Sequence, residues 1–303
     1  MGLPVYNGDR FLERAIDTLL AQTYRDFELI IVDNASTDRT GAIGRSFARQ
    51  DRRVQYWRNE QNLGAAANFR RAFELSHSEL FKWAAHDDEH EPDFIERCVA
   101  TLDEDPGVVL AYTQMRNIDE SGATLGVRST GLDTNNRDVA ARFRSLVRRK
   151  YPCVLAFGVA RSEMLRRTRL IQDYADCDRV MFAEIGLAGR IVELADPLFV
   201  RREHSARSVR QYRSRQTRSA WFDPSHADRP SFPYTRQLMG YTTAIERARI
   251  SATDRARCAG VMVEWLGRNA RGMGEDLMFA ARYAMRPLKR RVVHAPPPAR
   301  PAH

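Results

Sequence analysis

Short apolar runs alternate with amphipathic stretches along the first third of the chain. The apolar runs lie at residues 3–7, 27–32, 54–57 and 80–85, and their length and sharp polar ends predict buried strands. In the stretches between them, apolar residues recur every three or four positions, which predicts helices with one buried face. Alternation of strands and helices favours a parallel sheet covered by helices. The pattern therefore predicts an α/β fold.

The alternation continues, less regularly, to about residue 205. Further apolar runs predict strands at 108–112, 154–159 and 191–200, and Pro197 suggests an edge or a bend in the last of them. A helix is predicted to begin at Pro92, because proline is well suited to the first position of a helix. We therefore assign residues 1–205 to one α/β domain.

The remaining sequence differs in composition and in its pattern of apolar residues. Residues 206–288 begin with a polar, arginine-rich connection, followed by moderately apolar stretches that predict helices at 238–250, 252–266 and 275–285. The tail, residues 289–303, contains three consecutive prolines, and we predict that it is disordered. A helical C-terminal extension of the α/β domain is expected, without internal repeats.

The formal net charge of +9 is weak evidence for a nucleic-acid partner, because arginine supplies nearly all of the basic residues. The position of the charge is more informative. Seven arginines crowd one segment: Arg201, Arg202, Arg207, Arg210, Arg213, Arg215 and Arg218. This cluster would suit phosphates of a nucleotide, a lipid headgroup or a polymer. It has no interleaved aromatic platform or known reading motif, so nucleic acid is not the expected partner.

Cysteine spacing and hydropathy bear on the compartment. The four cysteines form no CxxC pair, which argues against a zinc site or a disulfide framework. No apolar run has the length of a spanning helix, and no signal peptide opens the chain. We expect a cytoplasmic protein whose basic segment and C-terminal helices make at most a peripheral contact with the inner face of the membrane. Because only Met1 and Gly2 precede Leu3, either the true start lies upstream or the first strand is shortened.

Polar side chains follow several of the predicted strands. Asn7 follows the first, Asp33 the second, and Asp87 and Asp88 a later one, while His204 follows the last. Parallel strands would bring the first three positions to one edge of the sheet, where ligands bind in open α/β folds. Two adjacent carboxylates there could hold a hard divalent cation against a diphosphate. The alternative is a helix-capping loop.

Four sequence motifs, in this order and spacing, resemble those of the family-2 glycosyltransferases of the GT-A fold. Residues 3–7 resemble the opening P-x-Y-N segment, and residues 31–38 resemble the V-D-(D/N)-x-S-x-D signature. Residues 62–68 are similar to the N-x-G stretch that follows, and residues 85–88 align with the D-x-D motif, with Ala85 where the first aspartate usually stands. The resemblance covers about residues 1–205 and implies a GT-A catalytic domain with a mostly parallel sheet.

The resemblance implies a donor site built from particular residues. Asp33 would accept a hydrogen bond from the nucleotide base, and Pro4 and Tyr6 would shape the base pocket. Asn62 and Asn68 would line the nucleotide side of the cleft. Alternatively, Asp33 caps the helix that follows it, and Asn62 has a capping role of the same kind.

The same resemblance implies a metal-binding site. Asp87 would contact the ribose, and Asp88, with His204, would ligate Mg²⁺ or Mn²⁺. Such a cation acts as a Lewis acid on the departing nucleoside diphosphate. The alternative for His204 is an ordinary surface histidine. Lys82 and Trp83 could contact the donor as well, although a tryptophan such as Trp83 more often belongs to the core.

Inversion at the anomeric carbon needs a base that deprotonates the acceptor hydroxyl. Asp178, ahead of an apolar helix, resembles the family's catalytic acid position. The alternatives are that Asp178 is the N-cap of that helix, or that Asp176 is the base. Glu184, nearly two turns further on, is expected to be structural.

Together these features predict a metal-dependent glycosyltransferase acting on a nucleotide-sugar donor, most simply a UDP-sugar. The acceptor would be a glycan, a lipid-linked sugar or a small molecule, and the reaction would serve the synthesis of surface polysaccharide or glycoconjugates. Because Ala85 replaces an acid of the motif, the alternative is a non-catalytic protein that binds nucleotide sugars or acts as a scaffold.

Overall fold

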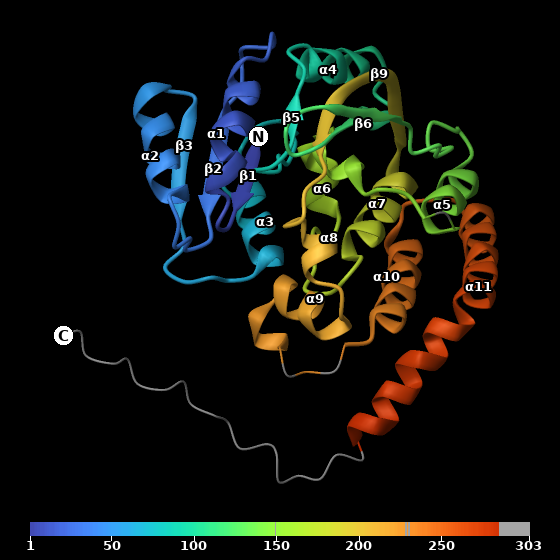
Figure 1. Ribbon diagram of the computed structural model, residues 1–303. Coiled ribbons are helices and arrows are strands. Elements are labelled where there is room, and N and C mark those ends of the chain that lie inside the picture. The colour runs from blue at the N-terminus through green and yellow to red at the C-terminus, as the bar shows by residue number, and fades with distance from the viewer. Residues whose placement is uncertain (149, 228, 230, 285–303) are drawn as a thin grey trace.

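The computed structural model describes residues 1–148, 150–227, 229 and 231–284. Its N-terminal part is a three-stranded parallel sheet in the order β1-β2-β3 (Figure 1). The strands β1 (Gly2–Val5), β2 (Leu29–Asp33) and β3 (Val54–Arg58) alternate with the helices α1 (Asp9–Leu20), α2 (Thr40–Gln50) and α3 (Ala65–Glu74). The alternation predicted for this part is confirmed. All residues of β1 and β2 are buried, as expected of strands covered on both faces.

A second, mixed sheet has the order β4-β8-β6-β9-β5, with β7 paired to β6. Its strands are β4 (Leu80–Phe81), β5 (Glu89–His90), β6 (Val108–Ile118), β7 (Thr124–Arg128), β8 (Val159–Arg161) and β9 (Arg190–Arg202). The N–H of Gly2 donates to the carbonyl of Lys82 over 2.9 Å, and the N–H of Ala84 donates to the carbonyl of Gly2 over 2.8 Å. Residues 82–84 therefore run parallel to β1 and join the two sheets.

Helices cover this sheet and extend beyond it. The helices of the central part are α4 (Phe94–Glu104), α5 (Val139–Arg148), α6 (Ser162–Arg167) and α7 (Cys177–Ala188), with a 3-10 turn η1 (Val154–Phe157). The later ones are α8 (Ser208–Gln211), α9 (Arg215–Phe222), η2 (Pro224–His226), α10 (Pro233–Arg247) and α11 (Ala252–Ala284). The predicted α/β architecture with a C-terminal helical part is confirmed.

Several predicted elements differ from the structure. The expected strand at 154–159 is a 3-10 turn followed by β8, because a short buried apolar run does not distinguish a strand from a helical turn. The strand expected at 80–85 reduces to β4 and the residues bridged to β1. At Pro197, where the sequence suggested an edge or a bend, β9 continues, but its register with β6 shifts between Leu194 and Phe199, in agreement with a bend. The helices expected at 252–266 and 275–285 are one helix, α11.

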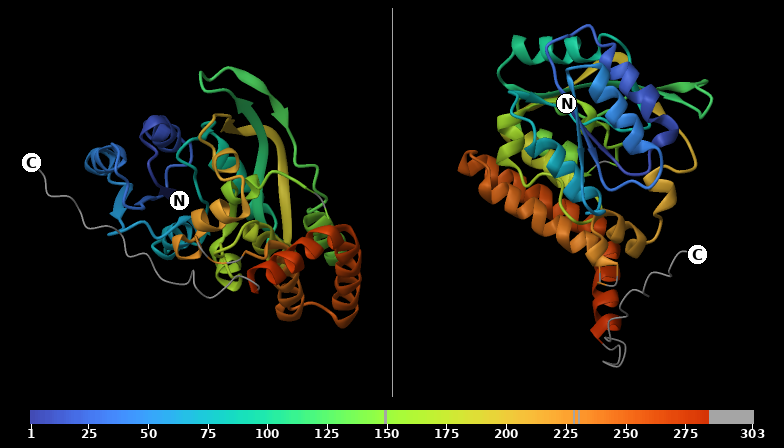
Figure 2. Two further views of the ribbon diagram at one scale, coloured as in Figure 1. Left: turned by 60° about the horizontal axis from the view of Figure 1, so that its bottom comes forward. Right: turned by 90° about the vertical axis from the view of Figure 1, so that its left-hand side faces the viewer.

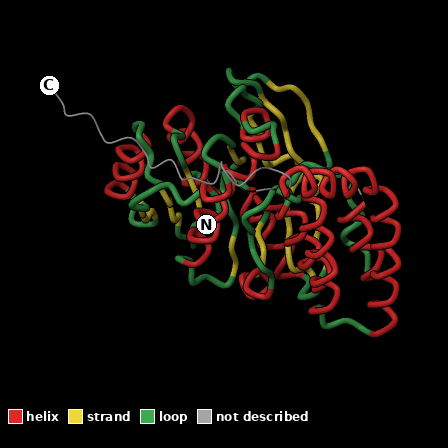
Figure 3. The backbone as a smooth tube through the Cα atoms, turned by 90° about the horizontal axis from the view of Figure 1, so that it is seen from below, coloured by secondary structure: helices red, strands yellow, loops and turns green. Residues whose placement is uncertain are grey.

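The segments after residue 205 pack against the α/β part. α9 contacts α3, α10 packs on α7, and α11 packs on α5 and on α10 (Figure 2, Figure 3). The division predicted at residue 205 stays a prediction, and the tail 289–303 lies outside the described residues. Within the described part, no helix combines the length and the apolar character needed to cross a membrane. All four cysteines are unpaired.

Candidate active site

The carboxyl ends of β1, β2 and the segment 82–84 meet at one edge of the sheet. The N–H of Asn7, just after β1, donates to Ser36 Oγ over 2.9 Å, which joins the loops that follow β1 and β2. A Cβ atom on Gly8 would lie only 2.5 Å from the ring of His86, so the turn into α1 touches the segment that leads to Asp87. The structure thus brings together the polar strand ends that the sequence singled out.

Asp33, the last residue of β2, is fully buried and held by three donors. Its Oδ1 accepts from the N–H of Ser36 over 2.8 Å, and its Oδ2 accepts from the Tyr56 hydroxyl over 2.6 Å and from Arg58 Nη1 over 2.5 Å. The β2–β3 register sets Asp33 beside Arg58, which explains the ion pair. Asp33 does not cap α2, which begins only at Thr40. The sequence reasoning missed both Tyr56 and Arg58.

Four asparagines form a hydrogen-bonded network behind Asp33. Asn34 Nδ2 donates to Asn62 Oδ1 over 2.8 Å, and Asn59 Nδ2 donates to Asn34 Oδ1 over 2.8 Å and to Asn68 Oδ1 over 3.0 Å. Asn68 also donates to the carbonyl of Val32 over 2.9 Å. Asn62 and Asn68 thereby fix the loops around the end of β2. Because buried amides are costly unless they are paired, this network makes the loop geometry specific.

Asn62 also holds the start of α3. Its Oδ1 accepts from the N–H of Gly64, the residue that precedes α3, over 2.9 Å. Gly64 has φ +82°, and a Cβ atom there would lie 2.4 Å from the carbonyl oxygen of Phe222. The segment that contains α9 and η2 therefore packs tightly against the loop before α3.

Aromatic side chains lie beyond the end of β1. Pro4 is buried within the strand, and Tyr6 follows it with 42% of its surface exposed. Burial raises the pKa of Tyr212, and the proximity of Tyr6 adds to that shift. The Tyr212 ring stacks on Trp221 with the ring centres 5.8 Å apart. Tyr212 and Trp221, which the sequence reasoning missed, thus place an aromatic pair near Tyr6.

Asp87, which is largely buried, and the buried His204 form a pair at the other end of the site. Asp87 Oδ2 lies 2.8 Å from His204 Nε2. The His204 ring packs against Phe11, with the ring centres 5.0 Å apart, and only 4% of the residue is exposed. His204 is therefore not an ordinary surface histidine.

Asp88 is buried next to this pair. Its Oδ1 accepts from the N–H of Arg202 over 3.0 Å and lies 3.8 Å from Arg207 Nη1. Burial and the adjacent negative charge of Asp87 raise the pKa of Asp88. Burial alone would also raise the pKa of Asp87, but His86, the hydrogen bond from His204 and Arg207 together lower it.

The electrostatics of the two carboxylates fit a divalent cation. Two adjacent buried aspartates repel each other, and a cation between them would stabilise both in their ionised forms. Carboxylate oxygens are the ligands that Mg²⁺ and Mn²⁺ prefer, and an imidazole nitrogen is acceptable to Mn²⁺. The donor types of Asp87, Asp88 and His204 suit these cations, but within the described residues their ligand atoms do not all lie within 4.8 Å of one another.

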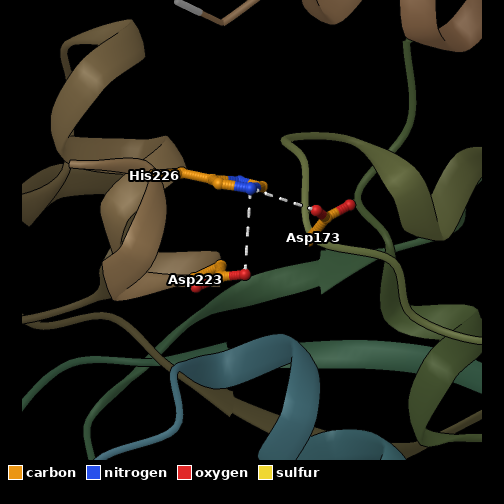
Figure 4. A group of neighbouring side chains, drawn as sticks. All are labelled: Asp173, Asp223 and His226. Carbon is orange, nitrogen blue, oxygen red and sulfur yellow. Dashed lines mark ion pairs between the residues drawn. The ribbon is translucent and has the colours of Figure 1, made fainter. Parts of the chain in front are cut away.

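Another acid and histidine cluster lies elsewhere. Within the described ranges, the only three such residues whose ligand atoms all lie within 4.8 Å of one another are Asp173, Asp223 and His226 (Figure 4). His226 Nε2 is 3.4 Å from Asp173 Oδ2 and 3.9 Å from Asp223 Oδ2. Because Arg236 donates to Asp173 Oδ1 over 3.0 Å, the cluster forms an ion-pair network that links η2 and α10 to the loop before α7.

Asp178 lies in the first turn of α7. The N-cap position belongs to Asp176, which has a left-handed φ of 63°, so the interpretation of Asp178 as the N-cap is wrong. Burial, followed by the charge of Asp176, raises the pKa of Asp178, against the opposing effects of Cys153 and Arg179. A carboxylate with a raised pKa is better matched to accepting a proton near neutral pH.

Trp83 and Lys82, which the sequence offered as possible donor contacts, and Glu184, which it predicted to be structural, all have contacts within the fold. Trp83 Nε1 donates to the carbonyl of Phe69 over 2.9 Å within the core. Lys82 is also buried, with Nζ 2.8 Å from His90 Nε2. Glu184 accepts from Arg169 Nε over 2.8 Å, which confirms its structural role.

The arginine cluster is partly neutralised by acids. Glu203 pairs with Arg201, Arg207 and Arg210. The Nε atoms of Arg201 and Arg207 are nevertheless buried and have no hydrogen-bond partner within the described part of the chain. Unpaired buried N–H donors of this kind fit an anionic ligand.

The family model described as glycosyl transferase family 2 matches residues 2–171. Among curated proteins, an uncharacterized glycosyltransferase of Rickettsia typhi is 33% identical over 124 residues, which cover 41% of this chain and 38% of that protein. The glycosyltransferase GlyG of Streptococcus pneumoniae is 32% identical over 132 residues, which cover 43% of each protein. The match thus spans well under half the length of these relatives.

Solved structures show the same fold. The chain resembles residues 1–349 of S. aureus TarS, solved in complex with UDP, with a TM-score of 0.62 at 15% identity over 88% of this chain and 70% of that one. It also resembles the mannosyltransferase PcManGT of Pyrobaculum calidifontis, solved with GDP-Man and Mn²⁺, with a TM-score of 0.53 at 17% identity over 95% of this chain and 75% of that one. The predicted GT-A fold is confirmed.

Proposed function

Because the chain belongs to glycosyl transferase family 2, we propose that it transfers a sugar from a nucleoside-diphosphate sugar to an acceptor hydroxyl, with inversion at the anomeric carbon. The observation that carries the proposal is the meeting of three strand ends. Asp33 closes β2, Asn7 follows β1, and Asp87 and Asp88 follow the segment beside β1. Such an edge is where open α/β sheets bind nucleotides.

We assign the base end of the donor to the loops around Asp33. The Asp33 carboxylate would accept from the base, with Pro4 and Tyr6 forming the walls of the pocket. Arg58 and Tyr56 hold that carboxylate in place, and buried Asn68, together with the more exposed Asn62, fixes the backbone beside it. UDP in TarS and GDP-Man in PcManGT support a nucleotide ligand without deciding between the two bases.

Asp87 would contact the ribose, while Asp88, with His204, would hold Mg²⁺ or Mn²⁺. A bound cation would supply Lewis-acid stabilisation of the departing nucleoside diphosphate. The buried, unpaired Nε donors of Arg201 and Arg207 would suit a diphosphate. Mn²⁺ in the PcManGT structure supports the choice of metal.

Asp178 is the proposed base. Its carboxylate would take the proton of the acceptor hydroxyl as that oxygen attacks the anomeric carbon, and the raised pKa suits this role. The acceptor is proposed to be a glycan, a lipid-linked sugar or a small molecule in the synthesis of surface polysaccharide or glycoconjugates. The glycosyltransferase names of its relatives support a transferase of this class.

The test is release of nucleoside diphosphate from a panel of UDP- and GDP-sugars, with Mn²⁺ or Mg²⁺ and with excess EDTA. The proposal expects turnover of at least one donor, loss of turnover in EDTA, and loss in Asp88→Asn. Asp103→Asn on the exposed side of α4 is the matched control and keeps full activity. Turnover by Asp88→Asn in EDTA would contradict the metal assignment.

The second candidate, a protein that binds nucleotide sugars without transferring them, is favoured by Ala85 and by the engagement of Asp88 with Arg202. Two measurements, donor-induced thermal stabilisation and release of nucleoside diphosphate, distinguish the two functions. A donor that raises the melting temperature, yet releases no nucleoside diphosphate with any acceptor, would establish binding without transfer.

A further inference from the structure

A small cavity lies where the segment from α9 to α10 folds against the loop before α7. Its volume is about 210 Å³, and its walls come from α9, η2, the start of α10 and Tyr174 of that loop. Pockets that hold ligands of drug size measure roughly 300–1,000 Å³, so this cavity is too small for a nucleotide sugar. Its lining residues are all different from those assigned above to the donor. A ligand of this cavity would therefore be a smaller molecule than the donor.

Three hydroxyl groups line the cavity and have no hydrogen-bond partner among the described residues. They belong to Tyr174, Ser219 and Ser231, of whose surfaces only 7%, 5% and 7% are exposed. Buried hydroxyls are normally paired, because an unpaired one gives up its bonds to water without replacement. Burial raises the pKa of Tyr174, so its hydroxyl keeps its proton and can donate. Three such groups around one cavity point to a polar ligand.

The other polar groups that line the cavity carry no negative charge. They are Arg229, His226 and Arg236, and no carboxylate of the described chain lines the cavity with them. Arg229 has no carboxylate oxygen at ion-pair distance within the ranges that the structure describes. Its guanidinium is therefore free to bind an anion. Guanidinium groups bind carboxylates and phosphates through paired, charge-assisted hydrogen bonds.

Two aspartates outside the lining compensate part of this charge. His226 Nε2 lies 3.4 Å from Asp173 Oδ2 and 3.9 Å from Asp223 Oδ2 (Figure 4). Arg236 uses only Nη1 for Asp173, and the other N–H groups of its guanidinium remain available. Arg236 also lies over the Tyr174 ring, 5.5 Å from its centre, which keeps the guanidinium beside the cavity. A metal ion suits this cluster less well, because it would have to displace Arg236 from Asp173.

We propose that the cavity binds the phosphate group of a small ligand. Arg229 and Arg236 supply the positive charge, while Ser219 and Ser231 donate hydrogen bonds. These four residues come from α9, the segment before α10 and α10 itself, so their donors reach the ligand from several sides. A phosphate monoester has three terminal oxygens that accept from different directions, whereas a carboxylate has two oxygens in one plane. The arrangement therefore favours phosphate over carboxylate.

The phosphate could come from either of two sources. Tyr174 and Asp178 are four residues apart in the stretch where the chain enters α7. If the acceptor carries a phosphate, the cavity would hold that group while the acceptor hydroxyl reaches Asp178. A free phosphate compound would instead fill the cavity without being glycosylated. The first source rests on the proposed function, whereas binding of phosphate in the cavity does not.

Calorimetric titration of the full chain with glycerol 3-phosphate and with inorganic phosphate tests the proposal. Both are expected to bind, and glycerol, which lacks the phosphate, is not. Arg229→Gln should weaken the binding by about tenfold or more, because it removes a charged donor. Arg247→Gln, at an exposed position of α10 outside the cavity, is the matched control and keeps the affinity. A wild type that binds neither probe overturns the proposal, as does Arg229→Gln with undiminished affinity.

Two further measurements exclude a structural effect and binding at the donor site. Ser231→Ala loses no hydrogen bond of the described fold, so its melting temperature without ligand should be unchanged, while its stabilisation by glycerol 3-phosphate should fall. The opposite pattern would make Ser231 a structural residue and overturn its role. Excess UDP should leave phosphate binding intact, and displacement by UDP would overturn the proposal. UDP that fails to bind would count against the proposed function alone.

Incubation with donor sugars distinguishes the two sources. Glycosylation of glycerol 3-phosphate, in which its hydroxyl oxygen replaces the nucleoside diphosphate at the anomeric carbon and its proton passes to Asp178, supports a phosphate-bearing acceptor. Turnover of a neutral acceptor that changes with inorganic phosphate in the wild type, and not in Arg229→Gln, supports a free phosphate compound as the ligand.

Discussion

Asp87 Oδ2 lies 2.8 Å from His204 Nε2, although 117 residues separate them in sequence. This contact ties the end of β9 to the loop after β4. Because His204 is buried and the Asp87 side chain is only 14% exposed, the position of His204 relative to the carboxylates is set by the fold and not by a mobile loop. A histidine placed this way is suited to complete a site that binds a cation or a diphosphate.

The first prediction concerns His204. We expect His204→Ala to raise the Mn²⁺ concentration needed for half-maximal nucleoside diphosphate release by about tenfold or more, because it removes a nitrogen ligand and the partner of Asp87. The measurement is a metal titration at saturating donor. His77→Ala, at an exposed position, is the matched control and should leave the titration unchanged. An identical Mn²⁺ requirement in His204→Ala would exclude the histidine from the metal site.

The second prediction concerns the ion pair between Arg58 and Asp33. Removing the guanidinium leaves a buried carboxylate with one fewer charged donor, so Arg58→Ala should lower the melting temperature and weaken UDP binding. Tyr56→Phe removes only a neutral donor and should have a smaller effect in the same direction. Calorimetric titration with UDP and thermal unfolding measure the two effects. Arg52→Ala, an exposed neighbour, should change neither.

The third prediction separates Asp178 from Asp176. Asp178→Asn should lower kcat by roughly 100- to 10,000-fold, because an amide cannot accept the acceptor's proton. Asp176→Asn should keep most of the activity, since asparagine also tolerates the left-handed conformation at this position. Donor binding, measured in parallel, should be unchanged in both variants. The opposite order of activities would transfer the base to Asp176.

Sequence patterns located the site because its residues follow strands that the apolar runs define. Asp33 and Asp87 come directly after such runs, so the ends of parallel strands bring them to one edge. Arg58 could have been found as well, because the register of adjacent parallel strands sets it beside Asp33. Nothing in the spacing points to Tyr212, whose place near Tyr6 depends on how the segment after β9 folds back.

The C-terminal helices show a second limit of prediction from sequence, which concerns where a helix ends. The amphipathic pattern predicted two separate helices, at 252–266 and 275–285. The structure has one continuous helix there, held by contacts on its buried face such as Gly272 against Tyr234. Tertiary packing decided this element.

The last prediction uses pH and Lys82, whose side chain is buried beside His90. Burial lowers the pKa of Lys82 to about 7, below the ordinary value of 10.5. Between these two pH values the unfolded chain binds a proton that the folded chain does not, so this group makes unfolding free energy rise with pH. We expect the stability of the wild type relative to Lys82→Met to increase from pH 7 to pH 10, with a slope approaching about 1.4 kcal/mol per pH unit. Denaturant unfolding at several pH values measures it, and Lys150→Met, at an exposed position, should run parallel to the wild type.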